Sequence, residues 1–279
     1  MTKKVALVTG ASSGIGESAV VELLGKGFTV YAAARRTERM AGLGENGAQV
    51  VALDVTDDAS MVACIDRIIA EQGRIDVLVN NAGYGSYGAV EDVPIEEAKR
   101  QFEVNVFGLA RLSQLVLPHM RAQESGRIIN ISSIGARLYE PFGAWYHATK
   151  FAVEGLSFSM RLEVAPFGVS VSCVAPAGVV TEWNTISRDS LLETSGSSAY
   201  GPWAKRAFKV LQTADGPAMS CTPDVVGRKI AKVATARRPK AVYPVGKGAR
   251  MIRGSFDVVP NGMTDLMLGQ VYGTGRSAR

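Results

Sequence analysis

A tyrosine and a lysine in the middle of the chain have the spacing of a proton-transfer pair. Tyr146 and Lys150 are four residues apart in a segment that is expected to be helical, so both side chains fall on one face about one turn apart. A free phenol has a pKa near ~10, and an adjacent ammonium group stabilises the phenolate and lowers that pKa. The pair predicts acid–base chemistry at the phenol oxygen. A solvated Tyr and Lys on an amphipathic helix is the alternative.

Two adjacent serines bring hydroxyl groups toward this pair. Ser132 and Ser133 follow the apolar run Ile128–Ile131, and Ser133 precedes Tyr146 by thirteen residues. The Ser133 hydroxyl and the phenol can therefore meet above the end of a strand, where Ser133 would hydrogen-bond a substrate oxygen. Serines at a strand end are also typical of a turn or a helix cap. His147 follows Tyr146 directly, and we expect it to be packed or solvated rather than catalytic.

A glycine-rich segment near the N-terminus predicts a nucleotide site. It connects an expected first strand to an expected first helix. Glycine permits a tight turn at the first position and a close approach of backbone to phosphate at the later ones, with the helix N-terminus facing the anion. The strand before and the helix after favour this interpretation over an ordinary glycine-rich turn. The expected contacts are Gly10, Ser12, Ser13, Gly14, Ile15 and Gly16.

The end of the second expected strand indicates which dinucleotide binds. NAD sites usually carry an acidic residue there, which accepts hydrogen bonds from the ribose hydroxyls. This chain has Ala34, Arg35 and Arg36 instead. No carboxylate repels a 2′-phosphate, and the Arg35 guanidinium is a planar fork suited to phosphate. We therefore predict NADP(H) as the cofactor, with a solvated pair of arginines as the alternative.

Two further strand ends are expected to face the same crevice. Asp54 and Val55 end the third strand, where a carboxylate or backbone group would meet the adenine amino group. The fourth strand ends at Asn80, after which small residues and amides face the crevice, although either segment alone would also suit a plain loop. The expected contacts after the fourth strand are Asn81, Ala82 and Gly83.

The elements that position these residues have an α/β pattern. Short apolar strands in succession, with helix-length segments between most of them, are typical of a parallel sheet covered on both faces. Right-handed crossovers then give a doubly wound, Rossmann-type α/β fold whose ligands bind beyond the carboxyl ends of the strands. A length of 279 residues with 47% hydrophobic content suits a single domain. The expected strands are Lys4–Thr9, Phe28–Ala33, Gln49–Leu53, Ile75–Val79, Arg127–Ile131, Val169–Val174 and Ala241–Val245.

The chain divides into a catalytic domain over residues 1–245 and a C-terminal extension over residues 246–279. Within the domain, residues 182–220 are polar but carry aromatic and aliphatic side chains, which predicts a substrate lid rather than disorder. The extension carries apolar residues such as Met251 and Leu266 that are interrupted by Pro260 and Gly262. Such a segment would cover the pocket, a neighbouring subunit or a membrane surface. The interruption favours a protein contact, with the membrane surface as the alternative.

Charge and composition exclude several functions. From Cys221 onward the chain has eleven Lys and Arg against three Asp, which fits a solvated or subunit-facing surface, or attraction to an acidic partner, an anionic substrate or a lipid headgroup. Nucleic acid is not expected. The three cysteines form no CxxC pair and the two histidines no metal-binding cluster, so we expect neither disulfides nor a metal. No apolar run approaches the ~20 residues of a membrane span, and we expect a cytoplasmic protein.

Together, these motifs give the chain a family resemblance. The order and separation of Thr9–Gly16, Asn80–Gly83, Ser133, Tyr146 and Lys150 resemble the short-chain dehydrogenase/reductase family from about residue 4 to residue 245. The resemblance implies that Tyr146 is the general acid–base. It also implies that Lys150 lowers the tyrosine pKa and binds the nicotinamide ribose, and that Ser133 positions the substrate oxygen. The regions 31–36 and 151–183 look closest to the branch of 17β-hydroxysteroid and retinol dehydrogenase-like enzymes.

The same resemblance implies three more site residues. Asn105 matches the asparagine that holds a water in the proton relay, with an Asn that bends a helix as the alternative. Val179 and Thr181 match the loop that seats the nicotinamide carboxamide. The family often places glycine directly after the proline of this loop, whereas this chain has Ala177 there and Gly178 one position later. The conformation of this loop is therefore open.

The expected function is NADP(H)-dependent interconversion of a carbonyl and an alcohol on a small, apolar substrate, by a homo-oligomer (a dimer or tetramer). The alternatives are an NADP(H)-binding regulatory sensor without turnover, and an epimerase or dehydratase that uses the same Tyr and Lys. Apolar character is inferred from aromatic residues near the expected strand ends, which would suit rings or alkyl chains but equally a core or a subunit interface. These are Tyr84, Tyr87, Tyr139, Phe142 and Trp145.

Overall fold

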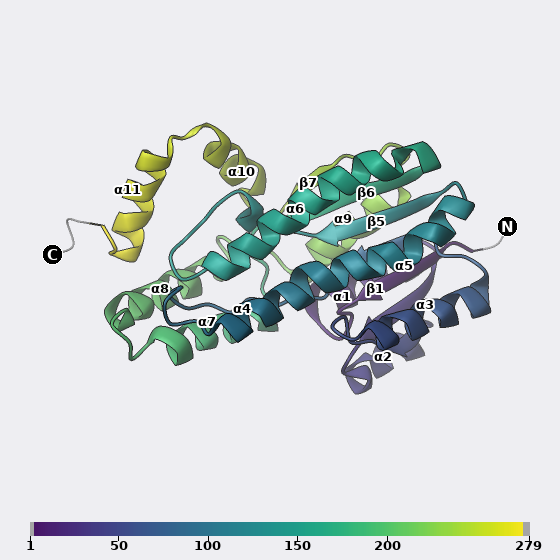
Figure 1. Cartoon of the computed structure of the whole chain (residues 1–279), viewed down its shortest axis with the longest axis horizontal. Helices are drawn as coiled ribbons and strands as arrows, with labels where there is room; N and C mark the ends of the chain where they lie inside the picture. The colour runs from purple at the N-terminus through teal and green to yellow at the C-terminus, as the bar shows by residue number, and fades with distance from the viewer. Residues whose placement is uncertain (1–2, 276–279) are drawn as a thin grey trace.

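The computed structural model describes residues 3–275, and within them seven parallel strands form one sheet in the order β3-β2-β1-β4-β5-β6-β7 (Figure 1). The predicted doubly wound α/β fold is confirmed. The chain leaves β1 in one direction to build β2 and β3 and returns to build β4 beside β1, so the ligand crevice lies between these two strands. The strands are β1 (Val5–Thr9), β2 (Thr29–Ala34), β3 (Gln49–Ala52), β4 (Val77–Asn80), β5 (Gly126–Ile131), β6 (Val169–Pro176) and β7 (Val242–Val245).

Helices cover both faces of the sheet because every central strand is apolar on both sides. In β1, Ala6 and Val8 belong to one core cluster and Val5 and Leu7 to the other, as expected when successive side chains alternate between faces. The first cluster lies under α1 (Gly14–Gly25) and α9 (Pro223–Thr235). The second lies under α3 (Asp58–Gln72), α5 (Gly108–Ala122) and α6 (Ala144–Val164) (Figure 1).

Short elements join these layers near the crevice. After β2 the chain forms a 3-10 turn at Thr37–Met40 and then α2 (Ala41–Glu45). Helix α4 (Ile95–Phe102) runs into α5 through a π-helical turn at Glu103–Phe107. Further 3-10 turns at Ile134–Ala136 and Ala165–Phe167 flank α6. The π-helical turn displaces the residues around it from regular helical register, and such turns are frequent at functional sites.

The segment at residues 182–220 folds into two helices, α7 (Glu182–Ser195) and α8 (Gly201–Ala214). They are held by a small separate core in which Leu191, Ala204 and Ala207 are fully buried. This core also contains Tyr87 from the loop after β4 and Tyr272 from the end of the chain. Residues far apart in the sequence therefore meet over the carboxyl ends of the strands.

The chain after β7 forms α10 (Ala249–Val258) and α11 (Asn261–Tyr272), which Figure 1 shows at the same end of the molecule as α7 and α8. Pro260 is the N-cap of α11 and separates the two helices, in line with the interruption in the apolar pattern. Among the described residues, none of these or the other helices is both long and apolar enough to span a membrane.

Candidate active site

Tyr146 and Lys150 lie on the first two turns of α6, with Gly143 at its N-cap. The Lys150 ammonium nitrogen is 5.8 Å from the centre of the Tyr146 ring. It also donates to the backbone oxygen of Ile131, at the end of β5, over 2.9 Å. Only 9% of Lys150 is exposed, so this charge is fixed at the junction of strand and helix.

The surroundings change the acidity of both groups. Burial raises the pKa of Tyr146 to about 12 and outweighs a hydrogen bond with Ser133 that lowers it. Burial also lowers the pKa of Lys150 to about 8. The sequence predicted that Lys150 would lower the pKa of Tyr146. In the structure of the chain without ligands this pKa is raised instead, because burial removes the water that would solvate the phenolate. Near neutral pH the phenol is protonated and the ammonium group is largely charged.

The two serines after β5 point to different partners. Ser133 caps the short turn at Ile134–Ala136, where its Oγ accepts a hydrogen bond from the Gly135 amide over 3.0 Å. Ser132 instead donates to Glu154 Oε1 over 2.9 Å, on the buried side of α6. Ser133, unlike Ser132, therefore lies beside the Tyr146 hydroxyl, and it also caps the turn.

Aromatic rings surround the Tyr146 side chain. The ring of Trp183 on α7 lies 5.0 Å from that of Tyr146, and the ring of Tyr87 lies 5.9 Å away. Gly85 permits this arrangement, because a Cβ there would lie 2.4 Å from Trp183 Cζ2. The environment of the phenol is thus apolar on the side of α7 and of the loop after β4.

Not every aromatic residue predicted for the pocket reaches it. Phe142 joins Tyr87 in the small core beneath α7 and α8. The other three pack elsewhere, so the sequence pattern overestimates the aromatic lining. Tyr139 contacts Phe256, Trp145 contacts Phe102, and Tyr84 lies under the guanidinium of Arg100.

Asn105 occupies the π-helical turn before α5 and is 2% exposed. Its Oδ1 accepts from the Tyr84 amide over 3.0 Å, and its Nδ2 donates to the Tyr84 carbonyl over 2.8 Å. The same Nδ2 is 3.2 Å from Thr149 Oγ1, which is next to Lys150 in the chain. Asn105 therefore joins the loop after β4 to the catalytic helix.

The glycine turn is shaped by close backbone contacts. Gly10 has φ +64°, and a Cβ at Gly16 would lie 2.3 Å from the Gly10 carbonyl oxygen. Asn81 closes the turn, because its Nδ2 donates to the carbonyls of Thr9 and Gly10 over 2.9 and 3.1 Å. Ala82 follows Asn81, and its amide donates to Thr9 Oγ1 over 3.0 Å. The glycine turn and the end of β4 thus form one unit.

The start of α1 suits an anion. Ser13 is the N-cap with an extended backbone, and its side chain makes no capping hydrogen bond. The first amide groups of α1 therefore have no side-chain cap and are available to a phosphate. Ser12 and Ile15 are half-buried in the same turn. The glycine contacts and the uncapped helix start fit the pyrophosphate of a dinucleotide.

The arginines after β2 are exposed, as a phosphate contact requires. Arg35 and Arg36 both lie at the surface. Asp54 is held by Thr56, whose amide and hydroxyl donate to Oδ1 over 2.9 and 2.8 Å. Burial raises the pKa of Asp54, but these hydrogen bonds and the charge of Arg35 have the larger combined effect. The pKa of this carboxyl group is therefore below its ordinary value. Arg35 and Asp54 thus lie close enough to influence each other.

The remaining predicted contacts line the crevice from both sides. Val55 is 9% exposed, and a Cβ on Gly83 would lie 3.0 Å from Asn105 Oδ1. Val179 is 8% exposed beyond the end of β6. Thr181 is the N-cap of α7, and its Cγ2 would lie 3.1 Å from a Cβ on Gly14. The loop after β6 and the glycine turn therefore touch.

The shifted glycine in the loop after β6 has a steric reason. A Cβ on Gly178 would lie 2.3 Å from Ser220 Oγ, so a side chain at this position would clash. The cysteine after Ser220 pairs with the loop, since the Cys221 amide donates to the Gly178 carbonyl over 2.9 Å. The departure from the family pattern therefore follows the packing of this chain.

Sequence reasoning missed three polar residues near the site. Glu140 accepts from the hydroxyls of Tyr87 and Tyr272 over 3.2 and 2.6 Å. Arg253 forms a buried ion pair with Glu154. Partners separated by 132 and 99 positions leave no local signal in the sequence.

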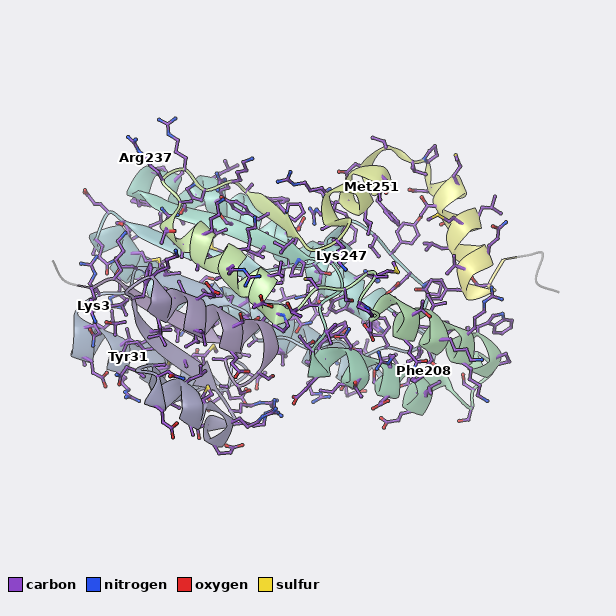
Figure 2. All side chains as sticks on the ribbon, turned by 180° about the vertical axis from the view of Figure 1, so that it is seen from behind. Lys3, Tyr31, Phe208, Arg237, Lys247 and Met251 are labelled. Carbon is purple, nitrogen blue, oxygen red and sulfur yellow. The ribbon has the colours of Figure 1, made fainter. Side chains whose placement is uncertain are left out.

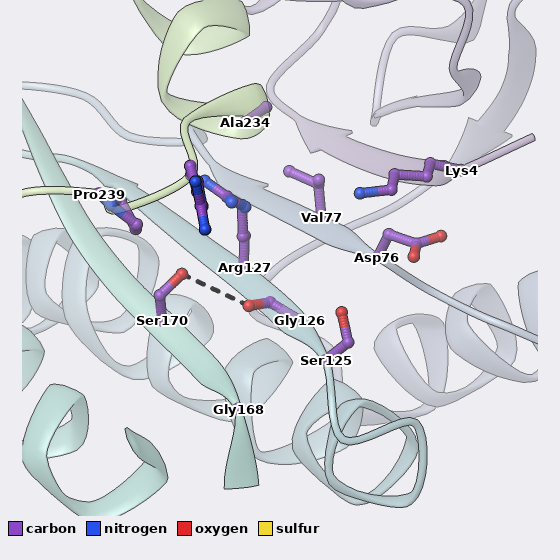
Figure 3. A pocket seen from close by; sticks show the side chains of 11 residues that line it. Lys4, Asp76, Val77, Ser125, Gly126, Arg127, Gly168, Ser170, Ala234 and Pro239 are labelled. Carbon is purple, nitrogen blue, oxygen red and sulfur yellow. Dashed lines mark hydrogen bonds between the residues drawn. The ribbon is translucent and has the colours of Figure 1, made fainter. Parts of the chain in front are cut away.

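A separate hollow of about 160 Å³ lies at the opposite end of the sheet (Figure 3). Its lining includes Lys4, Asp76, Arg127 and Ser170, which precede or begin the strands. Ser170 donates weakly to the Gly126 carbonyl over 3.5 Å. In a doubly wound sheet ligands bind at the carboxyl ends, so this hollow is distinct from the crevice near Tyr146.

Comparison with known proteins places these features in context. Residues 4–191 match the family model of short chain dehydrogenases. An oxidoreductase of Bacillus subtilis is 37% identical, with 90% of this chain and 92% of the relative covered. The 3-ketodihydrosphingosine reductase of Bacteroides thetaiotaomicron is 36% identical, with 88% and 89% covered. The NADPH-dependent 3-dehydrocapnine reductase of Ornithobacterium rhinotracheale is 30% identical, with 94% and 95% covered.

A solved structure agrees over nearly the whole chain. A short-chain dehydrogenase from Streptomyces avermitilis is 33% identical and superimposes with a TM-score of 0.81, with 98% of both chains covered. The match includes the helices after β7 as well as the sheet. These comparisons name a family and do not decide between its branches.

Proposed function

The chain belongs to the short-chain dehydrogenase/reductase family of oxidoreductases that act on carbonyl and alcohol groups, and we propose that it uses NADP(H) to interconvert the two on a small, apolar substrate. The observation that carries the proposal is the meeting of Ser133, Tyr146 and Lys150 at the end of β5. The catalytic domain spans residues 1–245, and residues 182–220 act as its substrate lid.

Tyr146 is the proton donor for reduction. With a pKa of about 12, its hydroxyl is protonated near neutral pH and can give its proton to the carbonyl oxygen as an alcohol forms. Ser133 holds that oxygen, because its hydroxyl lies beside the phenol and is anchored through Gly135. Lys150 stabilises the phenolate that remains and binds the nicotinamide ribose. Asn105 supports the proton relay through its contact with Thr149.

The residues around the crevice fit NADP(H). The glycine turn and the start of α1 would hold the pyrophosphate, and the exposed Arg35 and Arg36 would bind the 2′-phosphate. Asp54 and Val55 would hold the adenine, while Val179 and Thr181 would hold the carboxamide. When bound, the reduced dinucleotide supplies the hydride.

The aromatic rings around Tyr146 support the inference that the substrate is apolar. Trp183 and Tyr87 offer flat apolar surfaces within 6 Å of the phenol ring. Two relatives carry the names of 3-ketodihydrosphingosine and 3-dehydrocapnine reductases, and reduction of a keto group is the reaction that we assign to this chain. We also infer a homo-oligomer, the usual state in this family.

Absorbance of reduced nicotinamide tests this function. Purified protein with NADPH and a panel of apolar ketones and aldehydes should oxidise NADPH only when a carbonyl is present. A regulatory sensor would bind NADPH without oxidising it, and an epimerase or dehydratase would change its substrate without net oxidation. Binding without oxidation across the whole panel would favour the sensor.

A further inference from the structure

Arg253 is a buried charged residue that the proposed mechanism does not use. It lies on α10, and 9% of its side chain is exposed. Its Nη1 and Nη2 donate to Oε1 and Oε2 of Glu154 over 2.8 and 2.9 Å, a bidentate pair. Glu154 lies on α6 about one turn after Lys150 and has 4% of its side chain exposed. The extension after β7 therefore reaches the catalytic helix through a buried charge.

The same guanidinium reaches the serine segment. Arg253 Nη1 donates to the backbone oxygen of Ser133 over 3.2 Å. Its partner Glu154 accepts from the hydroxyl of Ser132 over 2.9 Å. The ion pair thus holds the Ser132–Ser133 segment by one side chain and one carbonyl group. The orientation of the Ser133 hydroxyl depends on the backbone that Arg253 fixes.

A second contact secures the other part of the same loop. The loop from Ser133 to Tyr146 contains Glu140, which accepts from the hydroxyl of Tyr272 over 2.6 Å. Tyr272 is the last residue of α11 and is 3% exposed. Helices α10 and α11 therefore each contribute one buried polar side chain to the loop that carries Ser133.

We propose that Arg253 is a positioning residue of the C-terminal extension that sets the orientation of Ser133 toward the substrate oxygen. This inference rests on the proposed function. A buried ion pair is often replaceable by apolar residues without loss of stability, so the pair alone gives little reason for a charge here. The third hydrogen bond, to the Ser133 carbonyl, is what an apolar side chain cannot supply.

The branched guanidinium group of Arg253 makes hydrogen bonds that a lysine at this position cannot all make. In Arg253→Lys, an ammonium group keeps the charge opposite Glu154 but cannot make the bidentate pair and reach the Ser133 carbonyl together. We expect kcat for carbonyl reduction to fall at least about tenfold, since small displacements of a reacting group have large effects on rate. The dissociation constant of NADPH should stay within about twofold. Arg250→Lys, on the exposed side of the same helix, is the control and should leave both values unchanged.

A double-mutant cycle separates positioning from a general loss of structure. In a Ser133→Ala background, Arg253→Lys should lower kcat by less than about twofold further, because the group it positions is gone. If the fold does not tolerate lysine, the joint change Arg253→Met and Glu154→Met removes both charges and should give the same loss of kcat. An equal loss with and without the Ser133 hydroxyl, or no loss, would overturn the proposal.

Hydrogen exchange provides a readout that needs no substrate. The Gly135 amide is bonded to Ser133 Oγ, so peptides covering residues 133–140 should exchange faster in Arg253→Lys than in wild type or Arg250→Lys. If the wild type reduced no carbonyl, the proposed function would be wrong, but hydrogen exchange would still test whether Arg253 holds the Ser133 backbone. Unchanged exchange in this loop would contradict the role of Arg253 whatever the activity.

Discussion

In the proposed mechanism Tyr146 acts through its hydroxyl oxygen alone, while its ring packs against Trp183 and Tyr87. Tyr146→Phe keeps the ring and removes the proton donor. We expect carbonyl reduction to fall by roughly 10²–10⁴-fold, the usual contribution of general acid–base catalysis. NADPH affinity should be nearly unchanged. Steady-state rates and fluorescence titration with NADPH measure the two effects, and Tyr87→Phe serves as a control that removes a nearby hydroxyl. Retained turnover in Tyr146→Phe would exclude the mechanism.

We expect Lys150 to set the pH dependence of reduction. Its pKa of about 8 lies below the ordinary value because the charged form is buried, so its charge is present below pH 8 and is lost as pH rises through that value. Tyr146 stays protonated up to about pH 12. The kcat/KM for reduction should therefore decrease above about pH 8 with the titration of Lys150.

Two substitutions at Lys150 check this assignment. Lys150→Arg keeps a positive charge over the whole range, so the decrease should move to higher pH. Lys150→Ala should lower the rate at every pH and also weaken NADPH binding, because it removes a ribose contact. A wild-type profile of kcat/KM that is flat between pH 7 and 10 would count against a role of the Lys150 charge in reduction. Unaltered NADPH binding in Lys150→Ala would count against the ribose contact.

We expect cofactor preference to depend on two neighbouring residues. Ala34 ends β2 without a carboxylate, and Arg35 follows it at the surface. Charge-assisted hydrogen bonds contribute roughly 1.5–3 kcal/mol, which corresponds to at least about a tenfold preference for NADPH. Ala34→Asp combined with Arg35→Ser should narrow or reverse this preference. Titration of both cofactors against wild type and this variant is the measurement. Equal affinity of the wild type for NADH and NADPH would show that Arg35 is not the selector.

The sequence predicted contacts between residues that are near each other along the chain, and it missed contacts between distant ones. Tyr146 and Lys150 are neighbours on one helix, so their spacing alone suggested their chemistry. Arg253 and its partners Glu154 and Ser133 lie 99 and 120 positions apart, and only folding brings them together. The raised pKa of Tyr146 was also missed, because burial depends on the tertiary surroundings.

At the scale of elements, the sheet was predicted closely and the helices around residues 182–220 were not. Buried parallel strands give nearly continuous apolar runs, and all seven expected strands occur within a few residues of their predicted bounds. Helices α7 and α8 bury few residues of their own and depend on a core shared with Tyr87 and Tyr272. A bend at Asn105 was considered, but the π-helical turn itself was not predicted, because its change of register is confined to one turn, which is too short to be recognised in the apolar pattern.

Two glycines in helices should respond in opposite directions to alanine. In α1, a Cβ at Gly16 would lie 2.3 Å from the Gly10 carbonyl oxygen, so Gly16→Ala should distort the phosphate-binding turn and weaken NADPH binding. In α10, Gly254 has no heavy atom within 4 Å of its would-be Cβ, so Gly254→Ala should stabilise the protein by about 0.5–1 kcal/mol. Cofactor titration and chemical denaturation measure these effects. NADPH affinity unchanged in Gly16→Ala would contradict the steric argument.

At the scale of the whole molecule, α10 and α11 expose an apolar surface at the end of the chain. Met251 and Val258 on α10 are 74% and 79% exposed, and Met263 and Leu266 on α11 are 65% and 63% exposed. Figure 2 shows Met251 on α10, in the half of the molecule away from Lys3 and Arg237. Surfaces of this kind mark contacts with another protein or with a membrane.

We expect this apolar surface to contact a second copy of the chain. Met263 and Leu266 are three residues apart and share one face of α11, while Pro260 prevents α10 and α11 from forming one long amphipathic helix. Replacing both residues by Glu places two charges in the contact and should shift the sedimentation coefficient to a smaller species. Val21→Glu, at a 52% exposed apolar position on α1, should leave it unchanged. Co-sedimentation of wild type with anionic vesicles, reversed by salt and lost in the double Glu variant, would instead assign the surface to a membrane.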